Sequence, residues 1–498
     1  MEDGEAPHAG IEHTDGARVH RPIVTLGYAG GLVRRVFLLC CLVVAALAAP
    51  SIARADEVSL LMDDGARIDA SLLLPAGTPP AGGWPAVMMF HGLGGKHADL
   101  LPLAGTFREQ GYAVFVPDAR GHGTSTGFVT LDGPREVADV RTEFQWLASR
   151  PEVSDTQIGV WGISLGGGAA WNSVAAGVPF KALETVETWS DLYTALYPRD
   201  LPKSGAIFGF AQSVPTQRID PSLRALVPQL ISGENLGTIR SLFSSRSSLQ
   251  FMKTVRTPSL LFQGRRDFAF DIDQAIAAYR ALAGPKHLYI GDFGHAPSTF
   301  PGPDVGTLLG RGLSWYDRFL KGMPNGVDTG KPVEVAPDPW KGNTVSYAAL
   351  PKVKQLRLTS PGTTSVGARG KVLRQWTFRS TGEQFGAPVV HVIASSRTQW
   401  PHLVAVLTRV NADRSETVLS DGGAATTIGR TPRSISFKLV SDANLIPTGA
   451  KLRLYLGATS TVQNVGNLLY LLPVPDGSQL TVRKVGLTLP LLAKTISR

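Results

Sequence analysis

Cysteine is nearly absent from this 498-residue chain, and its absence excludes several kinds of chemistry. The two cysteines, Cys40 and Cys41, both lie in one apolar run from Val36 to Ala49. If that run is removed, the remaining chain forms no disulfide, has no thiol nucleophile and offers no cysteine-ligated metal site. An enzyme of this composition is left with serine or carboxylate chemistry.

The same apolar run is too short to cross a membrane as a helix, which takes about twenty apolar residues. It follows a pair of arginines ending at Arg35 and precedes an Ala-Arg-Ala sequence ending at Ala55. That layout is typical of a signal peptide cleaved after Ala55. We expect residues 1–55 to be an N-terminal extension and signal peptide, and the protein to be secreted or periplasmic. An uncleaved anchor is the alternative, and association with the cell envelope is compatible with either.

Charged residues are few, 18% of the chain, and the net charge is +9. Lysine and arginine are scattered, without a basic stripe and without alternation with aromatic residues. Because nucleic-acid binding relies on such patches, we expect no nucleic-acid partner. The 43% of hydrophobic residues is typical of a globular protein, and the length predicts two domains.

Short apolar runs predict a parallel β-sheet in the first half of the chain. They are Ala86–Phe90, Tyr112–Val116, Ile158–Trp161 and Ser259–Phe262. Continuous apolar runs of this length are typical of strands covered on both faces. Helical patterns separate them, for example over Arg135–Ser149. This alternation predicts an α/β fold with the ligand site in the loops that follow the strands.

The pattern changes twice along the chain, and both changes predict boundaries. Residues 189–257 lose the alternation and show helical patches between prolines and serines, which indicates a cap over the site. After Leu320 the hydrophobic period becomes two, so residues 331–498 are predicted to form an antiparallel β-sandwich. The α/β core then comprises residues 56–188 and 258–322.

The pentapeptide G-x-S-x-G occurs twice, around Ser125 and around Ser164. Ser164 directly follows a predicted strand and precedes three glycines at a helix start, which is the context of a nucleophile elbow. Ser125 lies in a loop with no helix close behind, which favours an ordinary turn serine. We therefore predict that Ser164 is the nucleophile.

A serine nucleophile needs an imidazole to take its proton, because the free hydroxyl is protonated at neutral pH. In α/β-hydrolases the histidine comes last in the chain order, which leaves His287, His295, His391 and His402. His391 and His402 fall in the predicted sandwich, and His287 begins a strand-like run. His295 lies in the turn-rich loop after that run and is the predicted base.

The acid that orients the histidine should leave the preceding strand. Asp267 follows the strand Ser259–Phe262 by a short turn and is the predicted acid. Asp271 and Asp273 are interpreted as helix-start residues, which the helix dipole favours.

Two backbone amides are candidates for the oxyanion hole. They are those of Leu165, directly after the nucleophile, and Leu93, in a glycine-rich loop after an early strand. The same glycines are also compatible with a mere tight turn.

His91, His97 and His122 have no carboxylate cluster at ligand spacing, so we expect no metal and no cofactor.

Five segments together resemble the X-prolyl dipeptidyl-peptidase and cocaine-esterase type of serine hydrolases. They are Asp118–Gly127, Gly162–Gly166, Gln263–Asp267, Gly294-His295 and Trp315–Gly322. The resemblance spans nearly all of the chain after residue 55. It implies an α/β-hydrolase fold with a helical cap, a C-terminal all-β jelly-roll sandwich, and a triad of Ser164, Asp267 and His295. Members often carry tyrosine at the positions of Leu165 and Leu93.

The expected activity is hydrolysis of a small acyl ester or peptide through an acyl-enzyme. An acyltransferase of the same fold and a non-catalytic glycan- or envelope-binding protein are the alternatives, and the oligomeric state stays open. A dipeptidyl-peptidase must also hold a substrate ammonium. Glu184, Glu187 and Asp191 lie near the predicted cap, where we interpret them as helix or loop surface residues.

Overall fold

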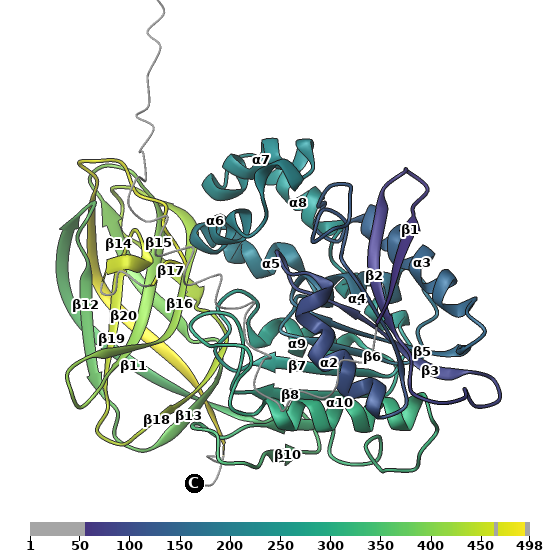
Figure 1. Ribbon diagram of the computed structural model, residues 1–498. Helices are drawn as coiled ribbons and strands as arrows, with labels where there is room; N and C mark the ends of the chain where they lie inside the picture. Colours follow the sequence, from purple (N-terminus) through teal and green to yellow (C-terminus); the bar gives the residue numbers. More distant parts are fainter. Residues whose placement is uncertain (1–54, 463–466, 494–498) are drawn as a thin grey trace, which may run out of the picture.

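The computed structural model describes residues 55–462 and 467–493, which form a layered α/β unit and a β-sandwich (Figure 1). The predicted signal peptide up to Arg54 lies outside the described residues. Within those residues, no helix combines the length and apolarity needed to cross a membrane.

Ten strands form the main sheet, in the order β1-β2-β4-β3-β5-β6-β7-β8-β9-β10. They are β1 (Asp56–Leu61), β2 (Arg67–Leu73), β3 (Trp84–Phe90), β4 (Ala113–Pro117), β5 (Val153–Ile163), β6 (Leu183–Val186), β7 (Ser259–Gly264), β8 (Lys286–Gly291), β9 (Val333–Val335) and β10 (Val345–Tyr347). From β4 to β9 all neighbours pair in parallel, and the outer pairs are antiparallel. The predicted α/β class is confirmed.

Helices cover both faces of this sheet (Figure 1). They are α2 (His97–Glu109), α3 (Pro134–Ala148), α4 (Leu165–Ala175), α9 (Ile272–Ala281) and α10 (Val305–Phe319). The predicted helix at Arg135–Ser149 is α3. It begins with Pro134, whose missing N–H costs nothing there, and Val140, Phe144 and Leu147 form its buried face.

The sandwich begins later than predicted, because the first strands after residue 331 belong to the α/β sheet. β9 pairs in parallel with β8, and β10 pairs with β9. Both strands are three residues long, which is too short to show a period in the sequence. The predicted boundary at residue 331 is wrong, and the sandwich strands start with β11 at Val353.

The segment between β6 and β7 is helical and covers the carboxyl ends of the strands (Figure 1). It holds α5 (Leu192–Leu196), α6 (Ser204–Gln212), α7 (Pro221–Ser232) and α8 (Leu236–Ser244). Their apolar residues pack into one cluster that also includes Leu165 and Phe270 of the α/β unit. We call these four helices the cap.

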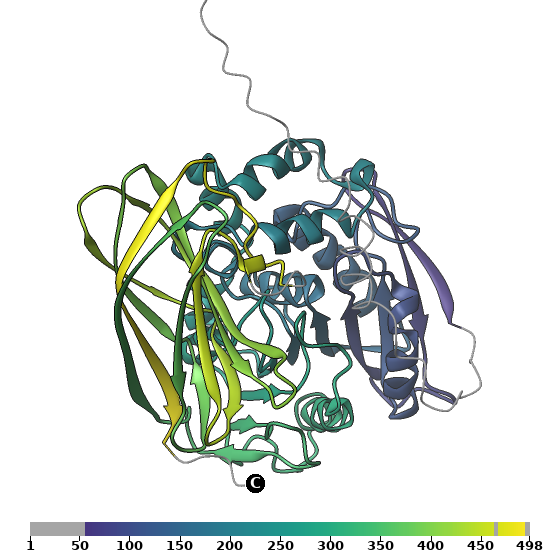
Figure 2. The same cartoon turned by 90° about the vertical axis from the view of Figure 1, so that its left-hand side faces the viewer.

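Two antiparallel sheets form the sandwich (Figure 2). Their strands are β11 (Val353–Gly367), β12 (Val372–Thr377), β13 (Gly382–Gly386), β14 (Val389–Ser396), β15 (Trp400–Val410), β16 (Glu416–Ile428), β17 (Arg433–Lys438), β18 (Asp442–Ile446), β19 (Lys451–Gly457) and β20 (Gln479–Leu492). In β15, Leu403, Ala405 and Leu407 face the sandwich core. Val404 and Val406 pack instead with Leu201 and Phe268 of the other unit. Because both faces of β15 are buried, the sandwich is firmly docked on the α/β unit.

Candidate active site

Ser164 occupies a sharp turn between β5 and α4. Its φ of 53° is a strained conformation for a residue with a side chain. The turn depends on the flanking glycines: a Cβ at Gly162 would lie 2.1 Å from the carbonyl oxygen of Gly166, and one at Gly166 would lie 2.1 Å from that of Phe90. The motif glycines are therefore required by close backbone packing, which presents the Ser164 hydroxyl at the end of the sheet.

The structure brings Ser164, His295 and Asp267 into one hydrogen-bonded row. Ser164 Oγ lies 2.9 Å from His295 Nε2, and His295 Nδ1 lies 2.7 Å from Asp267 Oδ2. Because Asp267 Oδ2 accepts from Nδ1–H, Nε2 is left as the acceptor for the serine proton. This is the geometry that a nucleophilic serine and its base require.

Two neighbouring loops hold the acid and the base. Asp267 follows β7 and is fully buried, and its Oδ1 accepts hydrogen bonds from the amides of Ala269 (3.0 Å) and Phe270 (2.9 Å). His295 follows β8, and its own amide donates to Asp267 Oδ2 at 3.3 Å. The carboxylate is thus fixed from both sides.

Asp271 is a helix-start residue, as the sequence predicts. Its side chain caps α9 by accepting a hydrogen bond from the amide of Asp273.

Leu165 and Leu93 both lie beside the nucleophile. Leu165 is the first residue of α4, where amides have no acceptor within the helix. The loop of Leu93 is close as well, since a Cβ at Gly92 would lie 3.5 Å from that of Ser164. The structure places both predicted oxyanion residues next to the serine, and their assignment as donors stays a prediction.

An apolar cavity of about 90 Å³ opens from Ser164 into the cap. Leu93 and Leu165 line it near the serine, side chains of α5, α6, α7 and α8 line much of the remainder, and residues of neighbouring loops, Phe270 among them, complete it. Apart from Ser164 and the indole of Trp189, every lining side chain is a hydrocarbon. The Trp189 N–H is already bonded to the carbonyl of Arg246 at 2.8 Å.

Glu187 is a buried neighbour of the triad that the sequence interpretation missed. The sequence interpretation of Glu187 and Glu184 as surface residues is wrong, because each is only 3% exposed. Carboxylate and imidazole atoms of Glu187, Asp267 and His295 all lie within 4.8 Å of one another. Glu187 Oε2 has no hydrogen-bond partner among the described residues. Its only sequence signal is its position directly after the short strand β6.

Two negative groups act on the imidazole. Burial disfavours the charged form of His295, but the charges of Asp267 and Glu187 outweigh it and raise the pKa of His295 to about 9. Burial raises the pKa of Glu187 to about 8; the imidazolium opposes this rise and Asp267 adds to it. The two raised pKa values are thus close together, so Glu187 and His295 compete for a proton.

The same three residues are a group of potential cation ligands among the described residues. Asp267 and His295 already use their facing atoms on each other at 2.7 Å. A cation bound between them would therefore disrupt the row that contains Ser164.

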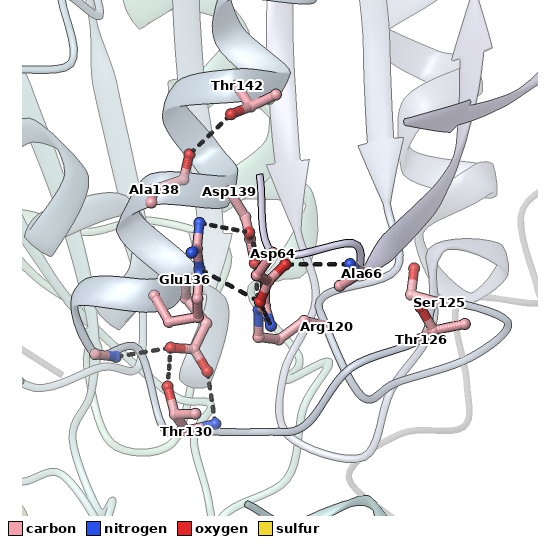
Figure 3. A network of polar contacts seen from close by, with 12 residues as sticks. Asp64, Ala66, Arg120, Ser125, Thr126, Thr130, Glu136, Ala138, Asp139 and Thr142 are labelled. Atoms are coloured by element: carbon pink, nitrogen blue, oxygen red, sulfur yellow. Dashed lines mark hydrogen bonds and ion pairs between the residues drawn. The ribbon is translucent and has the colours of Figure 1, made fainter. Parts of the chain in front are cut away.

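The second G-x-S-x-G serine is part of the scaffold. Ser125 Oγ donates to the carbonyl of Asp118 at 2.7 Å and accepts from the amide of Asp69 at 2.9 Å. In the same segment Arg120 binds Asp139 and Asp64 (Figure 3). These contacts tie the segment to α3 and to the β1–β2 hairpin, and they leave Ser125 without a catalytic partner.

The other three candidate histidines are engaged elsewhere. His287 Nε2 lies 2.9 Å from Glu334 Oε1, and His402 Nε2 lies 3.0 Å from the carbonyl of Ala458. His391 bonds hydroxyl groups on the neighbouring sandwich strands.

The fold and the site together define a serine hydrolase of the α/β-hydrolase class. The family profile of the X-Pro dipeptidyl-peptidases (S15 family) matches residues 64–297, so the resemblance drawn from the sequence motifs is confirmed. The match is to a family of hydrolases of the esterase or peptidase type.

Individual relatives agree in fold. A CocE/NonD family hydrolase from Staphylococcus aureus superimposes with a TM-score of 0.69 at 15% identity, covering 88% of this chain and 93% of that one. An α-amino acid ester hydrolase superimposes with a TM-score of 0.62 at 14% identity, and the match covers 90% of this chain and 99% of that one. An uncharacterised 31.7 kDa protein of Escherichia coli is 30% identical over 109 residues, which is 22% of this chain and 38% of that protein. The matched segment thus spans well under half of that curated relative.

Proposed function

We propose that the protein hydrolyses small acyl esters or peptides through an acyl-enzyme on Ser164. The observation that carries this proposal is the row of hydrogen bonds, 2.9 Å and 2.7 Å, from Ser164 through His295 to Asp267. The hydroxyl attacks the substrate carbonyl while His295 Nε2 takes its proton, and Asp267 stabilises the imidazolium that forms. The amides of Leu165 and Leu93 are the proposed donors to the oxyanion.

The second half of the reaction uses the same groups. The imidazolium gives its proton to the leaving group, which departs and leaves the acyl group on Ser164. His295 then takes a proton from a water molecule while the water oxygen attacks the acyl carbon. The bond to Ser164 Oγ breaks, the imidazolium returns its proton to that oxygen, and the carboxylic acid leaves.

A fluorophosphonate probe tests the nucleophile. The wild-type chain should be labelled, and Ser164→Ala should resist labelling and lose most ester hydrolysis, because the remaining groups offer no covalent route. Ser125→Ala is the matched control: it carries the same motif and should be labelled like the wild type. Equal labelling of Ser164→Ala and the wild type would exclude the proposed role.

We further propose that the enzyme acts outside the cytoplasm. The signal-peptide layout supports this, as does the first strand, which begins at Asp56 directly after the predicted cleavage site. Amino-terminal sequencing of the protein isolated from its producing cells should give Asp56 as the first residue. A protein that keeps the run Val36–Ala49 would contradict cleavage.

A further inference from the structure

The cavity beside Ser164 is continuous with the catalytic row. Ser164 itself lies in its wall. Phe210 and Phe270, which also line it, stack on each other with ring centres 6.0 Å apart and both meet the His295 ring edge-on. A substrate attacked by Ser164 therefore has this cavity directly beside its acyl carbon.

The cavity wall carries no ionisable side chain. Buried carboxyl groups of the α/β unit such as Glu187, Asp132 and Glu184 are not part of this wall. Glu187 lies beside the imidazole of His295 instead, and Glu184 accepts from the indole of Trp161 at 3.0 Å. An ammonium group entering the cavity would lose its water without gaining an opposite charge, which is strongly unfavourable.

The size of the cavity sets the length of the group it takes. One water needs about 10–15 Å³ of such space, so a cavity of about 90 Å³ has room for about six to nine groups of that size. Three residues of α7, Leu223, Val227 and Leu230, line the cap side of it and lie on one face of the helix.

We propose that this cavity binds the acyl part of the substrate, and that the enzyme is selective for uncharged aliphatic acyl esters of about six to nine carbons. This inference rests on the proposed acyl-enzyme at Ser164 and adds the substrate class. It places the protein apart from enzymes that must hold a substrate α-ammonium.

The direct test is a matched pair of substrates. The p-nitrophenyl esters of hexanoic acid and 6-aminohexanoic acid have the same chain and differ by a terminal ammonium. The kcat/KM for the hexanoate ester should be at least 100-fold higher than that for the 6-aminohexanoate ester. From acetate to octanoate each added methylene should raise kcat/KM about fourfold, until the cavity is full, and X-Pro-anilides should be cleaved slowly or not at all.

Variants of α7 locate the effect. Val227→Phe fills the cavity and should lower kcat/KM for octanoate at least tenfold more than it lowers kcat/KM for acetate. Leu230→Ala should move the optimum to longer chains. The control is Ala225→Phe, which adds the same ring on the exposed side of the same helix and should change neither substrate.

The outcomes separate this inference from the proposed function. If the fluorophosphonate labels Ser164 but chain length has no effect, or the ammonium ester is as good a substrate, the acyl pocket is wrong and the acyl-enzyme stands. If Ser164 is not labelled and no ester is cleaved, both are overturned.

Discussion

The residues of the site differ in what holds them in place. Ser164 lies in a strained backbone turn, and this turn is possible because the two flanking positions are glycines with no room for a side chain. Asp267 and His295 are held by hydrogen bonds to each other and to neighbouring amides. The backbone amide of Glu187 donates to the carbonyl of Phe262 at 2.9 Å, and its buried side chain has one carboxylate oxygen without a partner among the described residues. Its carboxylate lies beside the imidazole, where its charge raises the pKa of His295.

Glu187→Gln should shift the acid limb of the pH profile of kcat/KM to lower pH. The base works only when neutral, and the Glu187 carboxylate favours the imidazolium, contributing to the rise of the pKa of His295 to about 9. Removing that charge lowers this pKa, so activity persists further into the acid range. Ester hydrolysis measured from pH 5 to 10 checks the shift. Glu184→Gln is the control, since Glu184 is equally buried and bonds Trp161 instead. An acid limb that stays in place or moves to higher pH in Glu187→Gln would contradict the interaction.

At the scale of elements, the cap is connected to the loop that carries the acid. Lys203, just before α6, is 1% exposed. Its ammonium donates to the carbonyls of Phe268 (2.8 Å) and Ala269 (3.0 Å), directly after Asp267. Burial lowers the pKa of Lys203, and the surrounding aspartates oppose this. The cap therefore does more than cover the cavity: it also positions the acid.

Lys203→Met should lower kcat about 10- to 100-fold, because a small displacement of catalytic groups is costly, while KM for a short ester changes little. The substitution keeps the length of the side chain but leaves two buried carbonyls without donors, which should also lower the free energy of unfolding by about 1–3 kcal/mol. Steady-state kinetics and urea denaturation measure the two effects. Lys253→Met, at an exposed lysine in the same segment, should change neither. A fall in stability with unchanged kcat would limit Lys203 to a structural role.

At the scale of the whole molecule, the sandwich is part of the support of the active site. Arg265, two residues before Asp267, is fully buried. Its Nη2 atom lies 2.6 Å from Oε1 of Glu383 in β13. It also donates to the carbonyls of Ala443 in β18 (2.9 Å) and Ala336 (2.7 Å). The acid loop is thus held by both units at once, and the two units are expected to unfold together.

Glu383→Ala should lower the free energy of unfolding by about 3–5 kcal/mol, because it leaves the charge of Arg265 buried and unpaired. Activity should fall with stability, since Arg265 and Asp267 share a loop. Urea denaturation followed by fluorescence, together with residual ester hydrolysis, measures both. Asp476→Ala removes an exposed sandwich carboxylate, paired with Arg369 at 3.8 Å, and should have no measurable effect. A variant of Glu383 as stable as the wild type would show that the pair is dispensable.

The strands and the triad were predictable from the sequence for a physical reason. Strands buried on both faces need continuous apolar runs, and β3, β4 and β7 have them. An elbow needs glycines around its serine, and parallel strands send their following loops to one edge. β6 was missed because Glu184 and Thr185 interrupt its apolar pattern, although both are buried. The two three-residue strands β9 and β10 have no readable period.

The sequence by itself determined the order of chemical groups: which serine follows a strand, and which acid and base come after it. The tertiary structure alone decided what surrounds them. That Glu187 faces the triad, that the cap leaves an uncharged cavity at Ser164, and that Glu383 neutralises Arg265 all depend on contacts between residues far apart in the chain. Such contacts leave no local pattern, because each partner alone resembles an ordinary surface or core residue.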